Sequence, residues 1–208
     1  MPTDTETLAA ETFAERARLA ELLAGLTAEQ WAAPSLCAGW RVREVVAHMT
    51  MAFRIKPPAF FAGLLRARFD FDRYADRAAR SDTKKLSDTE LLEVLRSNIR
   101  HPWRPPGGGQ AGALSHDVIH GLDMTEPLGL PAAPPERIAL VLESSGPKSL
   151  AYFGVDLRGK RLAASDVELS VGEGVEVRMP ARELLLVVTG RRPLAEARTG
   201  PAGEEGDR

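Results

Sequence analysis

Apolar residues recur every three to four positions through most of the first 131 residues, which predicts amphipathic helices. Ser87-Asp-Thr-Glu90 has the form of a capping box, and the segment from Phe60 to Arg80 is interpreted as a helical or irregular crossover. A short capped turn is expected at Thr27-Ala-Glu-Gln-Trp31. Four longer helices are predicted, at about residues 3–26, 42–53, 87–100 and 113–124. Helices joined by loops of uneven length favour a four-helix bundle.

The pattern changes near residue 132, where a helix from Pro134 to about Tyr152 precedes segments in which apolar and polar residues alternate. These segments predict strands at about residues 155–162, 166–171 and 175–177, followed by a closing helix at 180–189. We therefore expect a helical bundle over residues 1–131, a small α/β domain over 132–195 and a disordered tail over 196–208.

Composition narrows the possible functions. A net charge of −2 lacks the electrostatic attraction on which nonspecific binding to nucleic acid or anionic membranes depends, so a small molecule is the expected partner. No apolar run approaches the roughly 18 residues of a membrane span, and the acidic N-terminus resembles neither a secretory signal nor a transit peptide. A single cysteine cannot form an internal disulfide. A cytoplasmic protein is predicted, and nothing indicates its oligomeric state.

Two histidines on the last bundle helix are spaced for metal binding. His116 and His120 are four residues apart, which places their side chains about 40° apart on one helix face. Together with His48, from the apolar stripe of the second helix, they could form a three-histidine site for zinc, nickel or iron. The alternatives are a chance pair on an exposed face, opposite Leu114, Val118 and Leu122, and a core histidine at position 48.

Asp123 and Cys37 leave two interpretations each, and His101 leaves one. Asp123 lies on the same arc as the histidine pair, where it could orient a ligand imidazole or form a salt bridge at the helix end. Cys37 could be a nucleophile, but an apolar setting without a histidine nearby in sequence favours a buried, inert thiol. His101, between Arg100 and Pro102 in a loop, is expected at the surface.

The order of these motifs resembles the DinB-like metal-binding superfamily, in its mycothiol-dependent maleylpyruvate isomerase branch. The resemblance covers about residues 5–195. Its motifs in the bundle are Leu26–Trp31, Cys37–His48 and Ser115–Asp123 followed by Pro127–Gly129, and those in the small domain are Ala164–Gly172, Val177–Ala181 and Leu184–Arg191. An excess of arginine over lysine, 22 to 5, and 30 alanines are typical of GC-rich genomes, and an actinobacterial source fits this family.

This resemblance implies a divalent metal, usually zinc, held by one residue of the second helix and two of the last, positions that His48, His116 and His120 occupy. The isomerase branch has glutamate where this chain has His116, so the set is closer to the three-histidine pattern of other DinB-like members. The resemblance also implies mycothiol as a thiol cosubstrate that is deprotonated on the metal, and an arginine, here Arg191 of the Thr-Gly-Arg motif, that holds a substrate carboxylate. A helix-end arginine bonded to carbonyls is the alternative for Arg191.

The leading hypothesis is therefore a metal-dependent enzyme that uses mycothiol to attack a small electrophile, as an isomerase or an S-transferase. A non-catalytic protein that binds a metal or a small ligand is the second hypothesis. A module in which the metal only stabilises the bundle is the third. The sequence identifies neither the electrophile nor the metal.

Overall fold

The computed structural model describes residues 4–144 and 155–197, and its chain divides into two compact units. One unit is Thr5–Pro131, and the other is formed by the residues from Ala132 onward with the first four. A mostly helical first part and a small α/β second part confirm the predicted fold class. None of the helices in the described residues has the length and apolarity that a membrane span requires.

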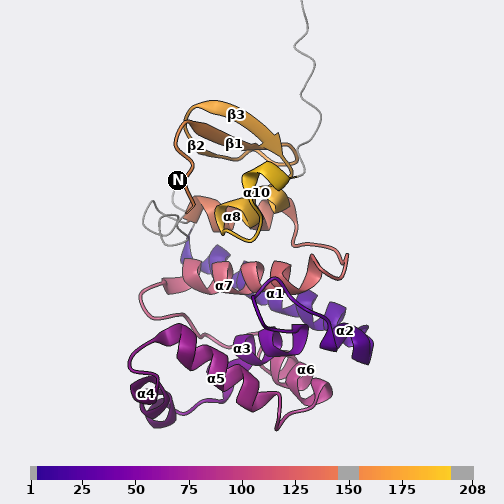
Figure 1. The fold of residues 1–208 in the computed structure, drawn as a ribbon, viewed down its shortest axis with the longest axis vertical. Helices are drawn as coiled ribbons and strands as arrows, with labels where there is room; N and C mark the ends of the chain where they lie inside the picture. The colour runs from indigo at the N-terminus through magenta and orange to yellow at the C-terminus, as the bar shows by residue number, and fades with distance from the viewer. Residues whose placement is uncertain (1–3, 145–154, 198–208) are drawn as a thin grey trace, which may run out of the picture. The chain divides into compact units, whose positions relative to one another are not determined.

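The N-terminal unit is a bundle in which the predicted helices correspond to α1, α3, α6 and α7 (Figure 1). Its main core is built from apolar residues that recur at helical spacing, such as Leu19, Val45, Leu91 and Met124. Helix α7 packs against both α1 and α3, so residues on two of its faces are covered. The helices of this unit are α1 Thr5–Ala24, α2 Ala28–Ala32, α3 Val42–Arg54, α4 Pro57–Arg66, α5 Phe71–Asp82, α6 Asp88–Ser97 and α7 Gly109–Thr125.

Two capping boxes form as the sequence predicts. The hydroxyl of Thr27 accepts from the Gln30 amide at the start of α2, and the hydroxyl of Ser87 accepts from the Glu90 amide at the start of α6. The crossover expected from Phe60 to Arg80 is more regular than predicted. It forms α4, which begins with Pro57 at its first position, and α5, which Asp70 caps by accepting from the Arg73 amide at 2.9 Å.

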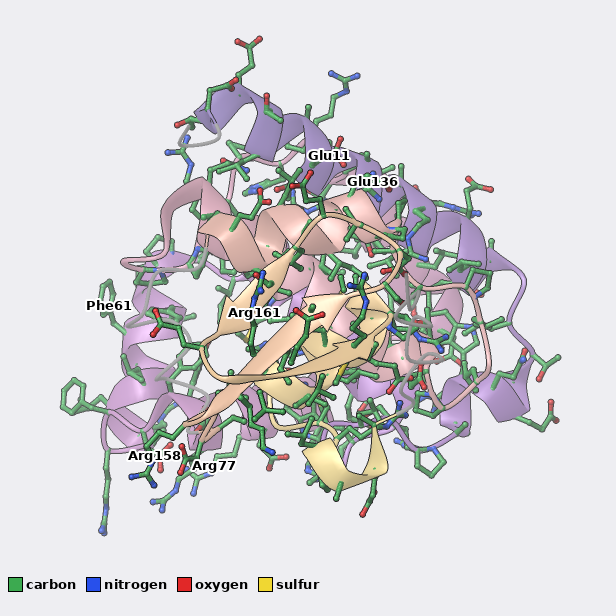
Figure 2. The ribbon with its side chains drawn as sticks, turned by 90° about the horizontal axis from the view of Figure 1, so that it is seen from above. Glu11, Phe61, Arg77, Glu136, Arg158 and Arg161 are labelled. Atoms are coloured by element: carbon green, nitrogen blue, oxygen red, sulfur yellow. The ribbon has the colours of Figure 1, made fainter. Side chains whose placement is uncertain are left out.

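The C-terminal unit contains a three-stranded sheet with the order β2-β1-β3, made of β1 Lys160–Ala164, β2 Ser170–Gly172 and β3 Val175–Met179. Strand β1 pairs antiparallel with β2 and parallel with β3. Helix α10 Ala181–Val188 packs against β1 and helix α8 Pro135–Ser144 packs against α10, while Arg161 lies over the other face of the sheet (Figures 1 and 2). Buried Leu162 and Met179 face the helices.

Several predicted boundaries in this unit differ from the structure. The first strand forms at Lys160–Ala164 rather than 155–162, because Gly159 adopts a positive φ of 71° and ends the preceding turn. Of the helix predicted to reach Tyr152, the part beyond Ser144 lies outside the described residues, as does the predicted tail from residue 198 onward. At the junction between the predicted domain and the predicted tail, Leu194–Glu196 forms a short 3₁₀ helix.

Candidate metal centre

Three of the four histidines converge in the N-terminal unit. One nitrogen each of His48 on α3 and of His116 and His120 on α7 lie within 4.8 Å of one another. The Nε2 atoms of His48 and His116 are 3.4 Å apart. Two imidazole nitrogens, each bound at about 2.0–2.1 Å to one tetrahedral ion, would be about 3.3 Å apart. The arrangement therefore fits a single divalent ion.

The histidine face of α7 is not an exposed helix face. Opposite it, Leu114, Val118 and Leu122 are buried in the bundle. The side chains of His116 and His120 themselves keep only 15% of their surface exposed. His48 of α3 lies against both of them, and the Trp103 ring centre is 5.1 Å from that of His116.

Each histidine of α7 has a carboxylate next to its Nδ1 atom. Asp117 Oδ1 is 2.8 Å from Nδ1 of His116, and Asp123 Oδ2 is 3.0 Å from Nδ1 of His120. An ionised carboxylate only accepts hydrogen bonds, so both imidazoles donate from Nδ1 and keep the lone pair of Nε2 for a metal. The structure thus gives Asp123 the orienting contact that the sequence left as one of two alternatives.

Sequence reasoning missed Asp117, because adjacent residues on a helix do not usually face each other. A buried arginine links Asp117 to α1. The Nε of Arg16 donates to Asp117 Oδ2 at 2.7 Å, and both side chains are at most 2% exposed. Arg16 Nη1 also donates to the carbonyl oxygen of His101 at 2.7 Å, and its guanidinium carbon lies 5.1 Å from the ring centre of Phe53. The fourth histidine, expected at the surface, is therefore partly buried beside this ion pair.

His48 differs from the other two histidines, since its Nδ1 is buried and has no hydrogen-bond partner among the described residues. Burial lowers the pKa of His48 well below its ordinary value, and the neighbouring imidazoles of His120 and His116 lower it further, against the opposing effect of Asp123. The neutral imidazole is the form that coordinates a metal. The ring of Trp40 packs on His48, with centres 5.2 Å apart, and its Nε1 donates to Asp76.

Cys37 has no histidine near it in sequence, but the fold brings one close to it. Its Sγ donates to Asp123 Oδ2 at 3.0 Å and lies 3.8 Å from Nδ1 of His120. The loop that precedes α3 folds against the end of α7, where the amide of Leu36 donates to the backbone oxygen of Asp123 at 2.9 Å. These contacts join residues more than 80 positions apart, so the local pattern around Cys37 carries no sign of them.

Replacing Cys37 by serine distinguishes two roles for the thiol, because Cys37, His120 and Asp123 also form a group that could hold a metal. We expect the variant to bind a divalent ion about as tightly as the wild type, since a serine hydroxyl can donate the same bond to Asp123 and Nδ1 of His120 is already hydrogen bonded. Competition with a chromophoric chelator would measure the affinity. A fall of more than roughly 100-fold, beyond what loss of an outer partner costs, would make Cys37 a direct ligand.

Arg191 lies in the other unit, directly after α10. Its Nη1 donates to the carbonyl oxygen of Thr189 at 3.1 Å, and its amide donates to the carbonyl of Leu186 at 2.8 Å. This carbonyl contact is the one expected of a helix-end arginine. A role for Arg191 toward a substrate carboxylate stays a prediction.

Comparison with known proteins shows what the chain is similar to. Residues 12–102 match the family model of the mycothiol maleylpyruvate isomerase N-terminal domain. Two crystal structures are similar over 91% of this chain and 90% of theirs, at 11% sequence identity: mycothiol-dependent maleylpyruvate isomerase, with a TM-score of 0.56, and a histidine-to-alanine mutant of it, with 0.55. A search among curated protein sequences finds no match. The resemblance predicted from the sequence is confirmed, and at this identity the structural likeness shows the fold.

Proposed function

Since residues 12–102 match the family model of the mycothiol maleylpyruvate isomerase N-terminal domain, we propose that this protein is a metal-dependent enzyme that uses a low-molecular-weight thiol. Mycothiol is the proposed thiol, a small electrophile is its partner, and the reaction is an isomerisation or an S-transfer. Zinc is the first expectation for the metal. The observation that carries the proposal is the convergence of His48, which lies in the matched segment, with His116 and His120, which follow it in the same N-terminal unit.

The donor set supports a metal with open positions. Three imidazoles leave at least one position of a tetrahedral ion for another ligand, which is the pattern of catalytic rather than structural zinc sites. A divalent ion bound there would supply a Lewis acid that lowers the pKa of a thiol and makes a thiolate available at neutral pH.

Residues around the three histidines, and one arginine of the other unit, have different roles in the proposed reaction. Asp117 and Asp123 hold His116 and His120 in the orientation that directs Nε2 to the ion. Trp40, packed on His48, excludes water from one side of the site. Arg191 is the proposed group for a substrate carboxylate, as a guanidinium can bind both carboxylate oxygens at once.

Purified protein with known metal content, incubated with mycothiol and either maleylpyruvate or an epoxide, tests the proposal. We expect product formation that is lost on chelation, returns with added metal, and leaves the helical circular dichroism signal largely unchanged throughout. The last result is expected because the bundle core, rather than the ion, holds the helices together.

Two outcomes would contradict the proposed enzyme. Tight binding of thiol or electrophile without turnover would favour a non-catalytic binding protein. Unfolding of the bundle on chelation would make the ion a structural one.

A further inference from the structure

A cavity of about 310 Å³ opens beside the histidine cluster and is lined by His48 and His116 at one end. Its walls come from the end of α3, from α4 and α5, and from the loop before α7. Its volume is about twice the roughly 150 Å³ of an apolar cavity that admits benzene. The cavity therefore has room for one ring with a short chain.

The walls of this cavity are apolar. They include Met51 and Ile55 from α3 and its end, Phe60 and Phe71 from α4 and α5, and Trp103 with two prolines from the loop. No carboxylate, amide or hydroxyl side chain is among the lining residues. A ligand with several polar groups would lose its hydrogen bonds to water here without replacing them, so the lining favours an apolar body.

One fixed charge borders the cavity. Arg104 is exposed, lines the cavity, and makes no hydrogen bond or ion pair with the described residues. A guanidinium at the rim of an apolar cavity favours a ligand with one anionic group, for which a carboxylate gives bidentate geometry. A second carboxylate on the ligand would have to lie against the apolar walls, away from the charge of Arg104.

The rim on the α4 side is also apolar. Phe61 and Phe71 expose 65% and 46% of their surface, and Phe61 projects outward from α4 (Figure 2). Phe61 packs against the lining residue Phe60, so the apolar surface continues from the cavity onto the exposed side of α4.

We propose that this cavity binds the electrophile as an apolar monocarboxylate of about one ring, with its carboxylate on Arg104 in place of Arg191 and its body between α3, α4 and the Trp103 loop. The cavity thus selects against small dicarboxylates, and maleylpyruvate is then expected to be the poorer of the two electrophiles named for the activity test. This inference rests on the proposed function, because it assigns the electrophile to the space next to the candidate metal ligands.

Calorimetry with three probes tests the inference, using 3-phenylpropionate, its neutral amide and maleate. It is performed on metal-free protein, where a carboxylate cannot bind to an ion, and again on zinc-loaded protein. We expect 3-phenylpropionate to bind at least about tenfold more tightly than maleate in both forms. Equal or tighter binding of maleate would overturn the inference.

Two kinds of variant test the charge of Arg104 and the space inside the cavity separately. Arg104→Gln is expected to weaken 3-phenylpropionate about tenfold and to leave the amide unchanged, whereas Arg100→Gln, at another exposed arginine, changes neither. Ala52→Phe, which adds a ring inside the cavity, is expected to weaken both compounds. Equal effects of the two arginine variants, or unchanged binding in Ala52→Phe, would overturn the assignment.

Measuring the metal content of each sample shows whether a negative result contradicts the cavity assignment or the proposed function. Selective binding of 3-phenylpropionate by protein that takes up no divalent ion would support the cavity assignment and contradict the proposed function. Turnover of a polar electrophile by metal-loaded protein, without binding of 3-phenylpropionate, would overturn only the cavity assignment.

Discussion

Replacement of His120 by alanine is expected to abolish stoichiometric binding of a divalent ion. The variant keeps two imidazoles, whose Nε2 atoms are 3.4 Å apart, but loses the third donor and its contact with Asp123. The loss in affinity should exceed the roughly 10–100-fold that removal of an outer partner costs. Metal analysis after gel filtration, with chelator competition for the residual affinity, would measure it.

His101→Ala is the matched control for this experiment. His101 is the one histidine outside the cluster, and its Nδ1 accepts from the amide of Trp103. Its backbone oxygen, which Arg16 uses, remains in the variant. We expect this variant to keep one ion per chain. Retention of the ion by His120→Ala as by the wild type would refute the three-histidine site.

Replacement of Arg16 by methionine is expected to destabilise the N-terminal unit by about 3–5 kcal/mol, the cost of leaving one member of a buried ion pair without its partner. Methionine keeps much of the apolar volume but removes the bond to Asp117 and the bond to the backbone oxygen of His101. Urea denaturation of the metal-free protein, followed by circular dichroism, would measure the free energy of unfolding.

An exposed pair provides the control. Arg73 and Asp70 are 3.8 Å apart and about half exposed, so Arg73→Met should cost about 1 kcal/mol or less. Adding Asp117→Asn to Arg16→Met should recover part of the loss, because the uncompensated charge is then gone. A loss in Arg16→Met no larger than that in Arg73→Met would show that the buried pair does not stabilise the bundle.

Local patterns in the sequence predicted much of the fold. The capping residues Thr27 and Ser87 mark helix starts because their hydroxyls satisfy amides a few residues away, an interaction confined to one turn. The spacing of His116 and His120 likewise places two side chains on one helix face. The two helices in residues 57–82 could not be predicted in the same way. Helix α5 has a strongly polar composition, and the turn between α4 and α5 has positive φ values at Arg68 and Phe69, which residues other than glycine seldom adopt.

Contacts between distant segments account for what the sequence did not predict in the site. Arg16 and Asp117 are 101 positions apart, and Cys37 and Asp123 are 86 apart. Arg16 lies on an amphipathic helix rich in charges, where nothing distinguishes a buried arginine from a solvated one. The periodicity of α1 identifies its apolar face but does not show that α7 presents a carboxylate to it.

The bond between the Leu36 amide and the Asp123 backbone oxygen has a consequence for the energetics of metal uptake. It attaches the loop before α3, the helix of His48, to the end of the helix that carries the other two histidines. Folding of the chain thereby restricts the motion of all three imidazoles before an ion arrives. At the proposed metal site, the conformational entropy of ordering the ligands would then be lost on folding rather than on binding, which would raise the affinity for an ion.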